Sequence, residues 1–160
     1  MTHFLVLLLA LLIGVVAGLR AMTAPAAVAW AAALQWINLD NTWVEWLAHP
    51  ITVTVLTILA VGELVSDKLP KTPSRKTPIQ FGTRLITGAF AGAVIGTAWG
   101  YKFGGLGAGM IGAVLGTLGG AEARRRLVAT TGGRDLPIAL SEDAVAVLGG
   151  FGIAALTAVV

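Results

Sequence analysis

The chain has 160 residues and a net charge of +3, with 56% hydrophobic and only 12% charged side chains. Soluble domains carry about 25% charged residues, so this composition predicts an all-α integral membrane protein with room for four or five helices and no soluble domain. The sequence contains no cysteine, which excludes disulfides, thiolate metal sites and cysteine nucleophiles. Its basic residues lie in short loops between apolar runs, so they indicate membrane topology and not nucleic-acid binding.

The first apolar run predicts a membrane span from about His3 to Met22. We interpret it as a retained span and not a signal peptide, because its start lacks Lys and Arg and because Arg20 lies where a cleavage motif needs small residues. Pro25 favours a break in the helix. The segment Ala24 to Ile37 has 14 residues, or about 21 Å of helix, which is too short to cross, so we expect a re-entrant or interfacial segment there.

Four further crossings are expected after an acidic, Trp-rich loop at residues 38–50. The expected spans are Ile51 to Lys68, Phe81 to Gly100, Gly104 to Ala123 and Ser141 to Val160. Ser141 is expected to cap the start of the last span. The whole chain is therefore predicted to be a single membrane domain with about five spans and a broken or re-entrant helix after the first.

Basic residues concentrate after the second and fourth spans, and loops rich in Lys and Arg face the cytoplasm. These basic residues are Lys68, Lys71, Arg75, Lys76, Arg84, Arg124, Arg125, Arg126 and Arg134. Five crossings then predict a cytoplasmic N-terminus and an outer C-terminus. The same topology gathers one aromatic belt at the outer interface, made of Trp36, Trp43, Trp46, Trp99 and Tyr101. If residues 24–37 crossed instead, everything before them would invert.

Glycine recurs every fourth residue on the third and fourth spans. The glycines in these two series are Gly88, Gly92, Gly96, Gly100 and Gly104, then Gly112, Gly116 and Gly120. Small residues at this spacing let helix backbones approach closely, so we predict glycine-zipper packing between these two spans or across a homodimer axis. The alternative is that the glycines line a narrow pore with backbone atoms.

Two pairs of segments are weakly similar to each other. Gly14 to Ala24 aligns with Gly88 to Ala98, and Thr54 to Glu63 aligns with Ala113 to Glu122. A true repeat would relate residues 3–68 to residues 81–126 as two hairpins running in the same direction, with 141–160 as a final helix. It would also place Glu122 opposite Glu63. Ala/Gly-rich helices produce such matches by chance, so this alternative stays open.

Ionisable residues in or at the ends of the spans are the candidates for function. They are Arg20, Glu63, Asp67, Arg84, Glu122, Glu142 and Asp143. The predicted topology brings all of them except Arg20 to the cytoplasmic ends of the spans, where carboxylates would bind a cation or a proton and arginines would balance them or bind an anion.

Several of these residues also have a structural explanation. Glu142 and Asp143 fall in the expected first turn of a helix, where acids act as caps. Asp67 suits the membrane interface. Arg20 either extends to the outer interface or contributes to a binding site at the helix break. Glu63 lies a turn deeper than Asp67, with apolar residues before it, which favours a buried and partnered role.

These residues carry a family resemblance that covers most of the chain. The matching features are GLRA followed by a proline, E-L-x-x-D-K-L-P at the end of the next span, an Arg at the start of the third and S-E-D before the last. Together they resemble the bacterial membrane family catalogued as domain of unknown function 4126. The matching positions are Arg20, Glu63, Asp67, Lys68, Arg84, Glu142 and Asp143. The chain departs from the family in the basic KTPSRKTP loop and in the spacing between Pro137 and Glu142. The resemblance implies the bacterial inner membrane and implies no activity.

The leading hypothesis is an oligomeric transporter or channel-like protein for a small ion or polar solute, in which Glu63 and Asp67 bind it and Arg20 acts as a gate or an anion contact. The alternative is a scaffold or accessory subunit that docks a larger membrane partner through its glycine-rich helices. An intramembrane enzyme is a third hypothesis, but the sequence has no HExxH, GxSxG or phosphate-loop motif. We expect no cofactor, leave metal binding by carboxylates open, and expect the lipid bilayer and further copies of the chain as partners, with no nucleic acid.

Overall fold

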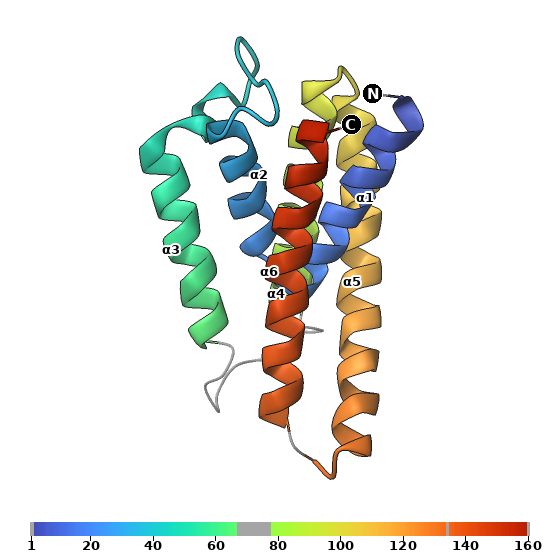
Figure 1. Ribbon diagram of the computed structural model, residues 1–160. Helices are drawn as coiled ribbons and strands as arrows, with labels where there is room; N and C mark the ends of the chain where they lie inside the picture. The colour runs from blue at the N-terminus through green and yellow to red at the C-terminus, as the bar shows by residue number, and fades with distance from the viewer. Residues whose placement is uncertain (1, 67–77, 134, 160) are drawn as a thin grey trace.

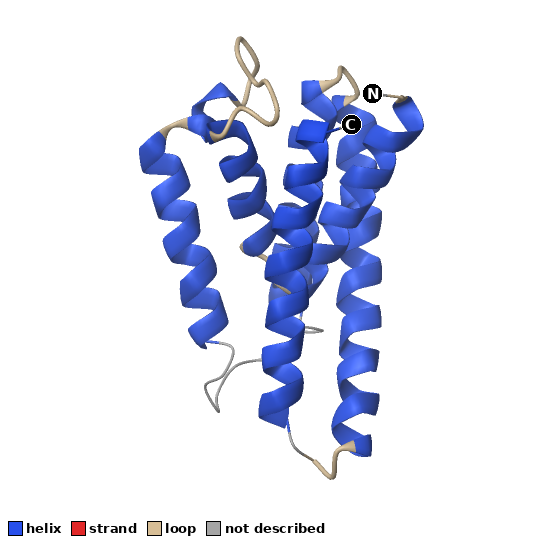
Figure 2. Ribbon diagram, in the orientation of Figure 1, coloured by secondary structure: helices blue, strands red, loops and turns tan. Residues whose placement is uncertain are grey.

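The computed structural model describes residues 2–66, 78–133 and 135–159, and all of its regular elements there are helices (Figure 2). The elements are α1 (His3–Leu19), α2 (Thr23–Ala33), the short 3₁₀ helix η1 (Glu45–Ala48), α3 (Pro50–Ser66), α4 (Pro78–Ala98), α5 (Lys102–Thr130) and α6 (Asp135–Val159). The predicted all-α class is confirmed for this part of the chain. By length and composition, α4, α5 and residues 136–159 of α6 are able to cross a membrane, whereas α1, α2 and α3 are apolar but shorter.

The predicted helix break is present, but its position differs from the prediction. The first helix ends at Leu19, and Arg20 is in an extended conformation, with φ −142° and ψ 110°. The next helix begins at Thr23, so Pro25 lies in its first turn. Amides of the first turn have no acceptor within the helix, so a proline there costs no hydrogen bond. The break therefore precedes the proline.

The helices α1 and α2 form a re-entrant hairpin (Figure 1). Along α1, Gly14 packs against Gly109 and Gly18 against Thr117, so α1 runs parallel to α5 and ends about halfway along it. From this point α2 returns toward the end where α1 began, because Met22 contacts Glu63 near the end of α3 whereas Trp30 contacts Thr57. The structure differs from the predicted first span, His3 to Met22, because α1 ends at Leu19 and α2 returns to the end of the bundle where α1 began.

This hairpin also changes the position of the N-terminus. Both ends of the chain lie at the same end of the bundle (Figure 1). The predicted cytoplasmic N-terminus and outer C-terminus require the two ends to lie at opposite ends of the bundle, so the structure differs from that prediction. The end that holds both termini also holds the five aromatic residues predicted to form a belt, and we call it the aromatic end. The other end, where α3 and α5 finish and α4 and α6 begin, is the basic end.

Close contacts at glycine hold α5 between α1 and α4. A Cβ atom on Gly92 would overlap the carbonyl oxygen of Gly105, and one on Gly88 would lie 2.6 Å from the Cβ of Ala113. On another side of α5, a Cβ on Gly112 would lie 2.9 Å from the backbone nitrogen of Val15 in α1. The three helices therefore approach one another at backbone distance, as small residues allow.

The two glycine series differ in their neighbours. Gly88, Gly92 and Gly96 on α4 meet α5, whereas Gly112 and Gly116 on α5 meet α1. Gly104 contacts Leu7 of α1, and Gly100 lies in the turn after α4 with φ +81°. Gly105 and Gly109 are glycines of α5 that face α4, and neither belongs to the two predicted series.

The loop between α2 and α3 closes the aromatic end of the hairpin. Four of its apolar side chains are buried, namely Ile37, Leu39, Val44 and Leu47. Trp43 donates its indole N–H to Thr97 of α4 at 3.0 Å, which ties the loop to the bundle. Backbone and side-chain bonds inside the loop, such as Asn41 N to Glu45 at 2.9 Å, give it a fixed shape. This end of the bundle is therefore packed with apolar side chains.

One of the two aligned segment pairs runs in opposite directions. Gly96 of α4 meets Gly105 of α5 and Gly88 meets Gly109, so α4 is antiparallel to α5, while α1 is parallel to it. The stretch Gly14 to Ala24 and its partner Gly88 to Ala98 are thus antiparallel, not parallel as the repeat hypothesis expected. The first stretch also contains the break, whereas its partner lies within one continuous helix.

Candidate functional site

The break between α1 and α2 lies inside the protein. Arg20 and Thr23 are 1% and 2% exposed, and Ala21 between them is 4% exposed. A helix end leaves carbonyls at its C-terminus and amides at its N-terminus without intrahelical partners. In hydrocarbon each such group costs several kcal/mol if it stays unsatisfied, so other helices must supply partners here.

Glu63 of α3 supplies the partners for the start of α2. The amide of Ala21 donates to Oε1 of Glu63 at 2.8 Å, and the amide of Met22 donates to Oε2 at 2.7 Å. The carboxylate thus lies at the positive end of the α2 dipole, which is the position that an anion would occupy at a free helix N-terminus. Glu63 therefore has the half-buried, partnered position that the sequence favoured.

Arg84 of α4 supplies the partner for the end of α1. Its Nη1 donates to the carbonyl oxygen of Gly18 at 2.8 Å, and the hydroxyl of Thr117 on α5 donates to the same oxygen at 3.4 Å. Arg84 is 3% exposed, although the predicted topology places it at the cytoplasmic end of the third span, beside a basic loop. Its charge therefore acts on the helix end inside the bundle.

Arg20 pairs with Asp143 of α6, which is 123 residues away in the sequence. Its Nε donates to Oδ1 of Asp143 at 2.5 Å, and its Nη2 contacts the same oxygen. Arg20 is one of the largest fully buried side chains, so the alternative in which it extends to the outer interface is wrong. The re-entrant path of the chain explains the error, because it brings Arg20 to the level of the other charges.

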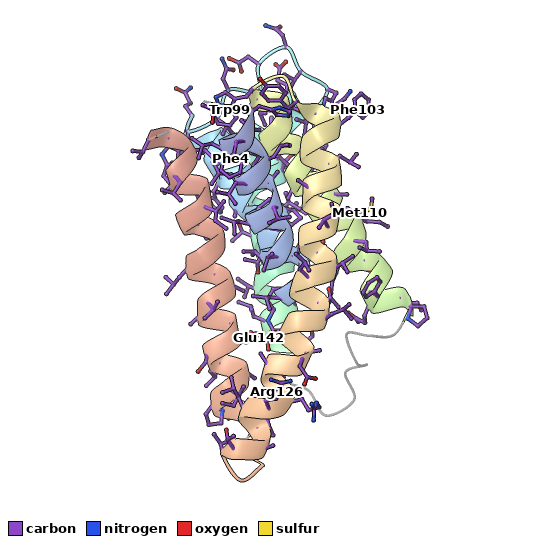
Figure 3. All side chains as sticks on the ribbon, turned by 90° about the vertical axis from the view of Figure 1, so that its right-hand side faces the viewer. Phe4, Trp99, Phe103, Met110, Arg126 and Glu142 are labelled. Atoms are coloured by element: carbon purple, nitrogen blue, oxygen red, sulfur yellow. The ribbon has the colours of Figure 1, made fainter. Side chains whose placement is uncertain are left out.

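The structure also rejects capping as the explanation for Asp143. The helix α6 begins at Asp135 and not at Ser141, whose hydroxyl donates to the carbonyl of Pro137 within the helix. Asp143 is thus eight residues into α6 and 8% exposed. Its neighbour Glu142 lies between α5 and α6, with its carboxylate 3.7 Å from Arg124 (Figure 3).

Glu122 lies apart from this group. It forms ion pairs with Arg125 and Arg126 on its own helix, at 2.6 and 2.8 Å, and its side chain is 40% exposed. Glu122 therefore differs from Glu63, because its ion pairs are with its own helix whereas Glu63 accepts from the backbone at the start of α2. Asp67 and Lys68 lie outside the described residues.

Four helices and Arg20 at the break between α1 and α2 thus contribute to one polar group, which we call the break cluster. It consists of Arg20, Glu63, Arg84, Thr117 and Asp143. Glu63 lies three residues before the end of α3, Arg84 six residues after the start of α4 and Asp143 eight after the start of α6. At helical rise these offsets correspond to about 5 to 12 Å, so the cluster lies nearer to the basic end.

Some members of the site carry no sequence signal. The amides of Ala21 and Met22 and the carbonyl of Gly18 matter only because the helix breaks there, and every residue has such groups. Thr117 lies in a run of small residues on α5, where a hydroxyl does not stand out. Thr23 is also buried at the break, and its hydroxyl has no hydrogen-bond partner among the described residues.

The cluster balances opposite charges. Within residues 2–66, 78–133 and 135–159, no group of three or more His, Asp or Glu side chains is placed to hold a metal ion. The cluster instead combines two carboxylates with two guanidinium groups, and each carboxylate contacts an opposite charge or a helix N-terminus.

Comparison with known proteins gives a family and no activity. The family described as "Domain of unknown function (DUF4126)" matches residues 7–160. No curated protein and no solved structure matches the chain.

Proposed function

Because the chain belongs to the DUF4126 family, whose description states no activity, we propose a function from the break cluster itself. The protein is a small multi-pass transporter or channel-like protein of the bacterial inner membrane that moves a small ion or polar solute. The observation that carries this proposal is the helix break in the interior, held by ionisable side chains from α3, α4 and α6. Ionisable residues inside membrane domains mark ion and proton pathways, and transporters build their binding sites at broken helices.

The contacts at the break define how such a site would work. Glu63 lies at the N-terminus of α2, where a solute anion would otherwise bind. Asp143 likewise accepts the hydrogen bond that the guanidinium of Arg20 could donate to a solute. A proton or small cation that neutralises either carboxylate weakens its contact with the amides or the guanidinium. The freed amides or guanidinium then bind a polar solute, so carboxylate and solute exchange at the same donors.

The access route is proposed from the packing around the cluster. Apolar side chains of the loop after α2, including Val44 and Leu47, close the aromatic end. Exchange with water therefore takes place from the basic end, which lies closer to the cluster. We propose that this end faces the cytoplasm, since Arg124, Arg125 and Arg126 lie in the part of α5 that ends there. Both termini would then lie on the opposite side of the membrane.

The test is flux through the purified protein in liposomes. Proteoliposomes containing a pH-sensitive dye are exposed to a potassium gradient with valinomycin, and proton entry is recorded. Glu63→Gln and Asp143→Asn should reduce the flux at least about tenfold, because each removes the charge that the exchange uses. Glu122→Gln is the matched control and should retain flux, because Glu122 is exposed and outside the cluster. Equal flux in all four proteins would eliminate the proposed role.

A scaffold or accessory subunit is the second candidate, and one observation favours it. Each carboxylate of the cluster is already engaged by the protein, Glu63 by two amides and Asp143 by Arg20, as in a purely structural network. Purification in mild detergent separates the two functions, since a scaffold copurifies with a larger membrane partner at fixed stoichiometry.

We also propose that the protein forms a homo-oligomer. Gly88, Gly92 and Gly112 pack within the chain, where they act as a glycine zipper between α1, α4 and α5. An oligomer interface would therefore use other small residues, such as Gly107 or Gly119, which have open space beside them.

A further inference from the structure

An apolar groove lies between α4 and α5, away from the break cluster. Its volume is about 470 Å³, and its walls include Leu85, Ala89, Phe90, Leu106 and Met110. Phe103 and Met110 extend from the side of α5 along which α4 runs (Figure 3). The groove opens sideways, so in a bilayer it faces the acyl chains.

One end of the groove carries a positive charge. Lys102, the first residue of α5, lines it, and its Nζ lies 4.8 Å from the ring centre of Phe103 and 6.0 Å from that of Trp43. Met110 follows Lys102 by eight residues, which is about 12 Å along the helix. The groove therefore has a cation at the aromatic end and a hydrocarbon wall that extends toward the middle of the bundle.

We propose that this groove binds one acyl chain of an anionic phospholipid, whose phosphate pairs with Lys102. The charge complementarity selects this occupant, since Lys102 is the charged side chain among the residues lining the groove and an anionic headgroup lies directly above its own acyl chain. Trp43 lies at the same level, as aromatic residues do at the membrane interface. A second copy of the chain would need a carboxylate next to an apolar ridge to match the groove. The proposal concerns the lipid-facing surface and does not depend on transport.

Native mass spectrometry of the purified protein with added lipid tests this site. Phosphatidylglycerol should bind in preference to phosphatidylcholine with the same acyl chains. Lys102→Gln should weaken phosphatidylglycerol binding about fivefold, because one cation near the headgroup contributes about that factor, and Lys102→Arg should restore it. Ala89→Leu, which fills the groove, should reduce the binding of both lipids.

Arg125→Gln is the control for general charge, because it removes an exposed cation at the basic end. If Arg125→Gln and Lys102→Gln reduce phosphatidylglycerol binding equally, the lipid responds to the overall charge of the protein and the groove site is rejected. Equal binding of the two lipids to the unmodified protein also rejects it. A homodimer that excludes lipid from the groove, and that Ala89→Leu disrupts, would assign the groove to a second copy instead.

Discussion

Arg20 shows how a single residue joins two distant parts of the chain. Its guanidinium is buried and contacts Asp143 across 123 residues. Removing one partner of a buried ion pair leaves a charge without compensation and costs about 3 to 5 kcal/mol, whereas replacing both with apolar groups costs far less. The pair is therefore suited to a double-mutant cycle.

We predict that Asp143→Leu lowers the free energy of unfolding by about 3 to 5 kcal/mol, and that adding Arg20→Met recovers a large part of the loss. Unfolding in mixed micelles of detergent and SDS provides the measurement. Glu122→Gln is the control and should leave stability unchanged, because that carboxylate is exposed. Strictly additive losses in the double variant would contradict an energetic pair.

Glu63 allows a second prediction at the residue scale, because its two oxygens serve two backbone amides. Glu63→Ala leaves both amides buried without a partner, at about 1 to 3 kcal/mol each, and Glu63→Gln keeps one acceptor. Hydrogen exchange at Ala21 and Met22 should accelerate most in Glu63→Ala and less in Glu63→Gln. Unchanged protection in both variants would show that other groups hold the start of α2.

At the scale of elements, the contact between α4 and α5 depends on the absence of side chains. Gly92→Ala would place a methyl group into the carbonyl of Gly105, so the helices must separate. We predict a loss of about 1 to 3 kcal/mol, as for overpacked cores. Gly82→Ala on α4 is the matched control, because a methyl group there meets open space and improves helix propensity. Thermal unfolding of both variants in detergent measures the difference, and similar melting temperatures would contradict the close packing.

The sequence predicts the elements better than their course through the bundle. Hydropathy and helix breakers are local signals, so the helical class and the break after the first helix could both be predicted. The path of α1 and α2 depends on which residues of the other helices contact the break, and no local pattern in the sequence predicts those contacts. The same limit explains the misplaced start of α6, since Ser141 has the composition of a cap but lies in a longer helix.

The residues of the candidate site likewise divide into those that local sequence signals identify and those that only the packing of the helices identifies. Glu63, Arg84 and Asp143 could be selected because charged residues are rare in apolar helices. Their partners could not, because the backbone groups at Gly18, Ala21 and Met22 gain their role from the break alone. Glu122 is predicted to belong to the same site because it is a charged residue at the end of a span. Its exposure depends on how α5 packs, which the helical pattern does not specify.

At the scale of the whole molecule, the hairpin makes a prediction about sidedness. The chain has no native cysteine, so single cysteines can be introduced at will. Thr2→Cys and Thr42→Cys, at the aromatic end, should react with an impermeant maleimide from the same side of the membrane. Thr131→Cys, in the turn after α5, should react from the opposite side. Opposite labelling of Thr2→Cys and Thr42→Cys would restore a crossing first helix.

The same hairpin imposes an order on how the protein is made. The α1–α2 segment leaves the ribosome before α3 to α6, yet the groups that complete its break come from these later helices. The ion pair between Arg20 and Asp143 therefore forms only after α6 is synthesised. Assembly is therefore governed by a contact that spans most of the chain, and truncation before α6 would leave the re-entrant hairpin incomplete.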